Sequence, residues 1–114
     1  MKELLRLDGG YLAYYNSYSV ACASCALPYV YGTDLCGNAD EDMLNSKLLI
    51  LWGHNPVDTH WGLTHIDNLM KAKKKGVRIV VVDPRQSDTA VIFADQWVPI
   101  RPTTDGAWLT LWPM

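Results

Sequence analysis

Residues 47–82 read KLLILWGHNPVDTHWGLTHIDNLMKAKKKGVRIVVV, two apolar runs joined by a segment of helical periodicity. The first run is continuously apolar from Leu48 to Trp52 and ends at Gly53, which is typical of a strand covered on both faces. The second run, from Val77 to Val82, is rich in β-branched residues and indicates another buried strand. Strand, helix and strand in this order predict a right-handed βαβ unit, and hence an α/β fold with a parallel sheet.

The segment between the two runs predicts an amphipathic helix. Asp58 or Thr59 can cap its start, and Gly76 suits the left-handed position that follows a last helical turn. The lysines within the stretch 71–75 complement the negative end of the helix dipole, so we interpret them as a solvated helix end. The apolar residues that recur at helical spacing are Leu63, Ile66, Leu69 and Met70.

The carboxyl-terminal third predicts a short strand and a final helix. Residues 96–100 read as a strand, and Pro99 places it at an edge or a bulge because proline cannot donate a ladder hydrogen bond. Thr103 or Thr104 can cap the final helix, and Asp105 is favourably placed in its first turn.

The amino-terminal third predicts one helix and one loop. The helix is expected to begin near Ser17 or Ser19. Residues 28–46 contain proline, glycines and asparagine among acidic residues, a composition typical of a surface loop.

The composition fits one domain without affinity for nucleic acid. A chain of 114 residues, 49% of them hydrophobic, is long enough for one modest core and too short for two, so residues 1–114 are expected to form a single domain. Ten basic and twelve acidic residues give a net charge of -2, which supplies no basic field for nucleic acid or an anionic membrane. No run of 18 or more apolar residues occurs.

The cysteines number three, which does not imply a complete disulfide framework. Cys22 and Cys25 have C-x-x-C spacing, which suits dithiol chemistry or half of a metal site. No second pair and no nearby histidine completes a tetrahedral set, so we interpret these two and Cys36 as packed or free thiols.

Polar residues follow both predicted central strands at the point where each ends. Gly53–Pro56 follow the first strand and Asp83–Arg85 follow the second. Because ligands of open parallel sheets bind beyond the carboxyl ends of the strands, these turns predict a binding rim. The Asp83 carboxylate can pair there with a ribose diol or a guanine edge, while backbone amides hold phosphate. The G-x-G-x-x-G fingerprint is absent after Trp52, which disfavours an ordinary NAD site.

Four separate stretches follow one pattern in order: GGYL…YS at 9–19, NSKL…WGHNP at 45–56, VDPR…DTA at 82–90 and ADQWVPIRP…TD at 94–105. Together they resemble the catalytic subunits of the dimethyl-sulfoxide-reductase family of molybdopterin oxidoreductases. The likeness covers nearly the whole chain. It implies a Rossmann-like βαβ unit with a parallel sheet that is part of a larger multidomain enzyme.

The resemblance also implies a cofactor and its contacts. In that family two molybdopterin guanine dinucleotides hold one molybdenum by their dithiolene sulfurs, and the cofactor carries out oxygen-atom transfer. Residues at both strand ends and before the final helix would line one guanine dinucleotide site, with Asp83 as the guanine anchor. These cofactor-binding residues are Trp52, Gly53, His54, Asn55, Pro56, Asp83, Pro84, Arg85, Thr104 and Asp105.

Ser19 matches the serine that binds the metal through its oxygen in the dimethyl-sulfoxide-reductase branch. The resemblance therefore implies that Ser19 is the metal ligand and the catalytic residue, and a hard alkoxide suits high-valent molybdenum. From its position alone, a serine at a helix start is a cap. Should the register slip, the thiolate of Cys22 would be the ligand, as in other branches.

Several of these residues also have plainer interpretations. Asp83 can simply end its strand and pair with Arg85. His54 is either a guanine or pterin contact or a polar turn residue, while His60 and His65 are expected on the exposed surface of the helix.

Two positions depart from the family pattern. Residues 16–17 are Asn-Ser where the family often has Gly-Asp, which changes the loop before Ser19. Thr103 stands where the family often has glycine, which alters a close approach of the backbone.

The intact parent implied by the resemblance removes oxygen from a sulfoxide or a related S- or N-oxide. We expect this chain to be an excerpt that is inactive alone, with an iron–sulfur cluster in the missing upstream part. The expected partners are the remainder of the catalytic chain, an iron–sulfur electron-transfer subunit, a membrane anchor subunit and the small oxide substrate. The parent would lie on the extracytoplasmic face of a prokaryotic membrane. The alternatives are a non-catalytic nucleotide-binding α/β module and an inert structural fragment.

Overall fold

The computed structural model describes residues 2–12, 18–34, 36–60, 62 and 64–111. By their contacts they form two compact units, residues 1–37 and residues 38–114. The second unit contains a parallel three-stranded sheet in the order β1-β2-β3, with helices between the strands. The α/β fold with a parallel sheet, predicted from the two apolar runs, is confirmed.

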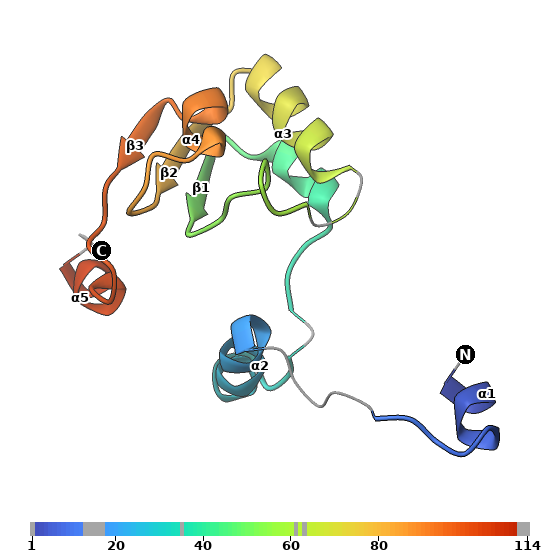
Figure 1. Cartoon of the computed structure of the whole chain (residues 1–114). Helices are drawn as coiled ribbons and strands as arrows, with labels where there is room; N and C mark the ends of the chain where they lie inside the picture. The colour runs from blue at the N-terminus through green and yellow to red at the C-terminus, as the bar shows by residue number, and fades with distance from the viewer. Residues whose placement is uncertain (1, 13–17, 35, 61, 63, 112–114) are drawn as a thin grey trace. The chain divides into compact units, whose positions relative to one another are not determined.

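A βαβ unit forms the centre of the second unit (Figure 1). β1 (Leu48–Trp52) and β2 (Arg78–Val82) are parallel neighbours, and α3 (His65–Lys74) connects them. The helix ends as predicted, because Gly76 adopts a φ of 84°, a left-handed conformation that glycine takes without a Cβ clash.

The third strand completes the sheet, and the fourth helix completes the helical layer over one of its faces. β3 (Gln96–Val98) pairs only with β2 and is an edge strand, as the proline that follows it predicts. α4 (Asp88–Phe93) lies beside α3 over the sheet and begins at Ser87, whose Oγ accepts a hydrogen bond from the N–H of Ala90. The sequence reasoning did not predict this helix.

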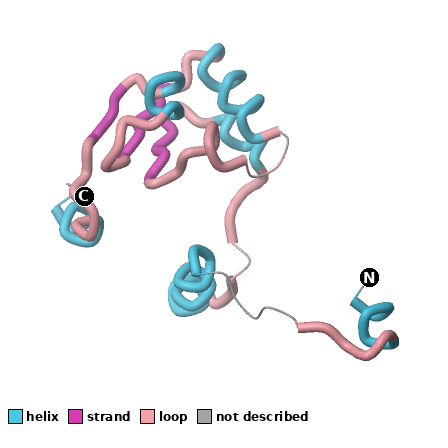
Figure 2. The backbone as a smooth tube through the Cα atoms, in the orientation of Figure 1, coloured by secondary structure: helices cyan, strands magenta, loops and turns pink. Residues whose placement is uncertain are grey.

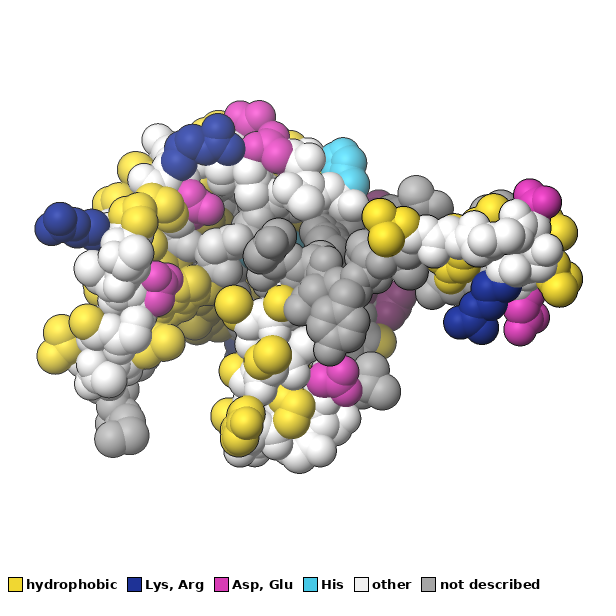
Figure 3. Space-filling model, turned by 60° about the horizontal axis from the view of Figure 1, so that its bottom comes forward, with side chains coloured by type: hydrophobic (Ala, Val, Ile, Leu, Met, Phe, Trp, Pro, Cys, Tyr) yellow, Lys and Arg dark blue, Asp and Glu magenta, His cyan; other side chains and the backbone are white. Residues whose placement is uncertain are grey.

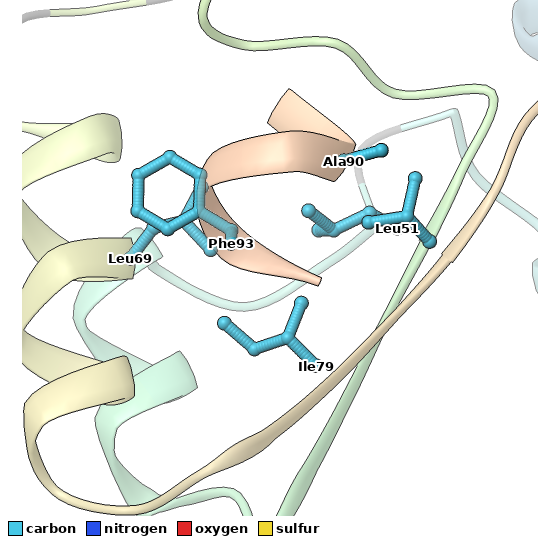
Figure 4. Packing of buried hydrophobic residues seen from close by; sticks show 6 residues of the cluster. Leu51, Leu69, Ile79, Ala90 and Phe93 are labelled. Carbon is cyan, nitrogen blue, oxygen red and sulfur yellow. The ribbon is translucent and has the colours of Figure 1, made fainter. Parts of the chain in front are cut away.

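The core lies between the sheet and these two helices. Leu51 of β1 and Ile79 of β2 meet Leu69 of α3 and Ala90 and Phe93 of α4 (Figure 4). The exposed fraction of each side chain is 8% or less. Burial of large apolar side chains on this scale contributes about 1.5–3 kcal/mol each, so these contacts fix how the helices sit on the strands.

The opposite face of the sheet is only partly covered, which corrects the prediction that β1 is buried on both faces. Leu48 is 48% exposed and Ile50 is 42% exposed, while Leu51 on the other face is buried. Apolar side chains reach the surface over several parts of the chain (Figure 3). A continuous apolar run thus marks β1 as a strand without deciding how many of its faces are covered.

The connecting helix starts later than predicted. Neither Asp58 nor Thr59 caps it, because residues 56–58 form a turn and the helix begins at His65. One of its lysines is also more than a solvated helix end: Lys73 Nζ donates to the carbonyl oxygen of Phe93 at 2.8 Å and to Asp95 Oδ1 at 2.6 Å. Leu63, expected in the apolar stripe, lies outside the described residues.

The first unit contains α1 (Lys2–Leu7) and α2 (Tyr18–Tyr31). α2 includes Pro28 and runs through the start of the segment predicted to be a loop. A 3-10 helix, η1 (Asp40–Asn45), occupies the end of that segment and belongs to the second unit. Among the described residues, no helix has the length and apolar character needed to cross a membrane.

Truncation of Leu69 tests the core. Leu69 is fully buried, and we expect Leu69→Ala to lower the free energy of unfolding by about 2–5 kcal/mol through lost transfer energy and a residual cavity. The neighbouring Met70 is 44% exposed, and Met70→Ala should change it by less than about 1 kcal/mol. Urea unfolding measures both. Equal losses in the two variants would contradict this packing.

Candidate functional site: the rim at the carboxyl ends of the strands

The turns that follow β1 and β2 lie together at one edge of the sheet. The last residues of the two strands, Trp52 and Val82, are paired, and the N–H of Gly53 donates to the carbonyl oxygen of Val82 at 2.9 Å. Figure 2 shows the loops that leave the two strands at this edge. The structure therefore brings the Gly53–Pro56 turn and the Asp83–Arg85 turn to one rim, as their positions in the sequence predict.

Two side chains outside the predicted site link the turns to each other. Asp58 Oδ2 accepts hydrogen bonds from the amide of Asn55 and, at 3.1 Å, from the guanidinium of Arg85. Thr89, fully buried at the start of α4, donates from Oγ1 to Asn55 Oδ1 at 2.6 Å and accepts from the N–H of Val57 at 3.1 Å. Asn55 is thereby held from both ends of its amide.

Only indirect signals for these two links are present in the sequence. Asp58 was interpreted as a helix cap, and Thr89 was part of the matched pattern without an assigned role. Both roles depend on tertiary contacts, which reach across 27 positions between Asp58 and Arg85 and across 34 positions between Thr89 and Asn55. Local sequence does not encode contacts of that range.

One carboxylate oxygen of Asp83 is hydrogen-bonded within the protein, and the other is available to a ligand. Its Oδ1 accepts from the backbone N–H of Arg85 at 2.8 Å, and its backbone oxygen accepts from the indole of Trp97 at 2.9 Å. Within the part of the chain that the structure describes, Oδ2 has no hydrogen-bond partner. The plainer interpretation, an Asp83–Arg85 ion pair, is not what forms, because the guanidinium of Arg85 bonds to Asp58.

Trp52 and Asp105 bond directly to each other. The indole N–H of Trp52 donates to Asp105 Oδ1 at 2.7 Å, a contact between residues 53 positions apart. Trp52 also meets Trp108 edge to face, with ring centroids 6.1 Å apart. These contacts hold α5 (Asp105–Leu111) near the end of β1, and they use one of the two Asp105 oxygens within the protein.

The turn before α5 is strained. Thr103 has a φ of 71°, and no other described non-glycine residue has a positive φ. A β-branched side chain is disfavoured in that region. Thr104, the residue immediately before α5, donates from Oγ1 to the carbonyl oxygen of Arg101 at 2.6 Å, and its own carbonyl oxygen accepts from the N–H of Trp108.

His54 forms a histidine pair that the sequence did not predict. Its Nε2 lies 2.9 Å from Nε2 of His65, and Nδ1 of His65 lies 3.2 Å from Asp40 Oδ1. Burial is the main cause of a His54 pKa below the ordinary histidine value of 6.5; the nearby His65 lowers this pKa further, and Asp40 opposes both effects. The expectation that His65 lies on an exposed helix surface is wrong, since its side chain is 16% exposed.

The remaining candidates are placed only in part. Pro56 is fully buried at the turn, whereas Pro84 is exposed. Ser19 is the second residue of α2, so the helix begins where it was expected, but the Ser19 side chain lies outside what the structure describes. Ser19 belongs to the unit formed by residues 1–37, and its role as a ligand stays a prediction.

The family model described as molybdopterin oxidoreductase matches residues 1–111. The chain belongs to this family. The resemblance drawn from the four stretches is thus confirmed, and family membership implies a molybdenum–molybdopterin cofactor.

Three relatives show how much of a family member this chain represents. It is 45% identical over 111 residues to the chain YnfE of Escherichia coli strain K12, covering 94% of this chain and 13% of YnfE. It is 42% identical over 109 residues to dimethyl sulfoxide reductase DmsA of the same organism, covering 92% of this chain and 13% of DmsA. It is 30% identical over 119 residues to biotin sulfoxide reductase of Cereibacter sphaeroides, covering 94% of this chain and 16% of that protein.

Replacement of Thr103 tests the strain at this rim. A β-branched residue at a φ of 71° costs on the order of 1–3 kcal/mol, and glycine removes that cost while adding disorder to the unfolded chain. We expect Thr103→Gly to raise the free energy of unfolding by about 0.5–1 kcal/mol. The matched variant Thr59→Gly, at an exposed residue without a positive φ, should lower it. Thermal unfolding gives both values, and a lower melting temperature for Thr103→Gly would contradict the argument.

Proposed function

We propose that this chain is the guanine-dinucleotide-binding part of a molybdopterin oxidoreductase that removes oxygen from a sulfoxide or a related S- or N-oxide. The named relatives support this reaction class, since they include a dimethyl sulfoxide reductase, a trimethylamine-N-oxide reductase and a biotin sulfoxide reductase. The chain spans 13% of the length of DmsA, so the reaction is proposed for a whole enzyme that contains this segment.

The observation that carries the proposal is the available oxygen of Asp83. A carboxylate can accept two parallel hydrogen bonds from the N1–H and the 2-amino group of guanine. The turn at Arg85 fixes the carboxylate through Oδ1, and among the described residues Oδ2 has no competing donor. The strand-end rim is the usual place for a nucleotide in an open parallel sheet. The residues present therefore fit a guanine-bearing cofactor.

Other rim residues would hold the phosphates or the shape of the site. Arg85 is 71% exposed and gives one of its five N–H groups to Asp58, so its other donors are available to a phosphate. Gly53, with a φ of 57°, shapes the turn. The Asp105 oxygen that Trp52 does not use can accept a ligand donor beside Thr104. Asn55 would act mainly by holding the turn, since its amide is bonded at both ends.

The bound cofactor would supply oxygen-atom transfer at molybdenum, while the residues of this chain bind and orient it. Ser19 would supply a hard oxygen ligand to the metal. A second guanine dinucleotide and an iron–sulfur cluster would be held by other parts of the enzyme. The partners we propose are an iron–sulfur electron-transfer subunit and a membrane anchor, at the extracytoplasmic face of a prokaryotic membrane.

Titration of the purified chain with GDP tests the guanine site. We expect binding that weakens at least about tenfold in Asp83→Asn, because a paired, charge-assisted contact is lost. Asp88→Asn is the matched control, since Asp88 is an exposed acid nearby at the start of α4. Isothermal calorimetry gives both affinities. No GDP binding at all, or equal loss in the two variants, would overturn the guanine assignment and favour an inert structural segment.

The metal-ligand role of Ser19 has a separate test in the whole enzyme. We expect Ser19→Ala to lower oxide reduction at least roughly tenfold and to change the electron paramagnetic resonance of Mo(V), because a direct oxygen ligand is removed. Ser24→Ala, in an exposed position of the same helix, should change neither. An unchanged Mo(V) signal in Ser19→Ala would exclude Ser19 as a ligand.

A further inference from the structure

A continuous chain of side-chain contacts runs from η1 through α3 to the Gly53–Pro56 turn of the rim. The Asp40 carboxylate lies 3.2 Å from Nδ1 of His65, and Nε2 of His65 lies 2.9 Å from Nε2 of His54. The two imidazole rings meet edge to face, with centroids 5.0 Å apart and planes at 85°. All three residues belong to the second unit, and His54 stands between Gly53 and Asn55 of the rim.

The chemistry of these contacts fixes the tautomers of the neutral pair. A carboxylate only accepts, so Nδ1 of His65 carries a proton and donates it to Asp40. A neutral His65 then has a lone pair on Nε2, which requires His54 to donate from its Nε2–H. Neutral His54 therefore bears its free lone pair on Nδ1. Within the described residues this nitrogen has no hydrogen-bond partner.

We propose that Asp40 and His65 are positioning residues that hold His54 with Nδ1 as a hydrogen-bond acceptor for the 2-amino-4-oxo-pyrimidine edge shared by guanine and pterin. This proposal rests on the proposed function, because it assigns a task to a residue of the same cofactor rim. Guanine and pterin both present N–H donors on that edge. A neutral imidazole nitrogen is a suitable acceptor for them.

One added proton reverses the role of Nδ1, whichever ring receives it. Protonation of His54 itself places a hydrogen on Nδ1, the only free lone pair of its ring. Protonation of His65 on Nε2 makes His65 the donor, and neutral His54 then accepts at Nε2 and carries its hydrogen on Nδ1. In both cases the acceptor becomes a donor that opposes an incoming N–H group. The pair is thus a proton-controlled switch on cofactor binding.

The surroundings set the pH range of the switch. The titratable groups that act on His54 from the elements packed against it are His65 of α3 and Asp40 of η1. Asp58 of its own turn is engaged by Asn55 and Arg85. Because burial and His65 together lower the pKa of His54 below 6.5, His54 itself is neutral at neutral pH. His54 itself gains a proton as the pH falls below 6.5 through this lowered pKa.

Nitrogen-15 spectra of the histidine rings test the positioning without any cofactor. At pH 8 the chain should show His65 as the Nδ1–H tautomer and His54 as the Nε2–H tautomer. Asp40→Ala should convert His65 to a mixture, and the adjacent Glu41→Ala should leave both rings unchanged. Asp40 is exposed, so neither variant removes core contacts. An unchanged His65 tautomer in Asp40→Ala would overturn the positioning role.

Binding measurements test the switch and separate the two ligand sources. Guanosine and neopterin serve as probes, each titrated at pH 5.5 and pH 7.5. The probe that His54 contacts should bind more weakly at pH 5.5, and roughly fivefold more weakly where His54 is fully protonated, as expected for one lost hydrogen bond. His54→Asn places an oxygen acceptor near the Nδ1 position without a titrating group, and its affinity should not change with pH. His60→Gln, at the exposed histidine of the neighbouring turn, should keep the wild-type pH dependence.

The outcomes distinguish this inference from the proposed function. If GDP binding depends on Asp83 while affinity for both probes is independent of pH, the guanine site stands and the switch is refuted. If neither probe binds at either pH, the acceptor role of His54 is refuted even where the tautomers match. A pH dependence that persists in His54→Asn would assign the titrating group elsewhere and overturn the proposal.

Discussion

The candidate residues of the strand-end rim depend on the parallel pairing of β1 with β2. The register runs from Leu48 opposite Arg78 to Trp52 opposite Val82, so both strands end at the same level. A shift by one residue would turn Leu51 and Val81 away from the helices and move the two turns out of alignment. The core contacts of Leu51 and Ile79 with the helices therefore secure more than stability, since they set the geometry of the rim.

Much of this arrangement was predictable because its signals are local. Apolar runs, β-branched residues and Gly76 mark the strands and the helix end, and the order of elements then requires both turns to share one edge. The placement of Asn55 and Asp83 at one rim follows from the same rule. The predictions were wrong where tertiary contacts determine a helix boundary or the burial of a side chain. The helix start at His65 and the exposed face at Ile50 both depend on what lies nearby in space.

The histidine pair illustrates that limit most clearly. His65 was expected at the surface because its position in the sequence shows only a polar residue near an amphipathic helix. Its burial comes from η1, which lies within a segment whose composition is typical of a loop, and from His54 across 11 positions. Asp40 is one of several acids in that segment, and nothing local distinguishes it from Glu41 or Asp42. Distances, not residue types, identify the pair.

The strain at Thr103 is explained by the path of the chain between β3 and α5. β3 lies beside β2, yet Asp105 bonds to the indole of Trp52 on β1, and the chain makes a turn at residues 102–103 between β3 and α5. The left-handed conformation of Thr103 provides the turn, and the bond from Trp52 to Asp105 offsets its cost. The turn leads directly to Asp105, whose carboxylate is a proposed cofactor contact, so the strained segment positions one residue of the proposed site.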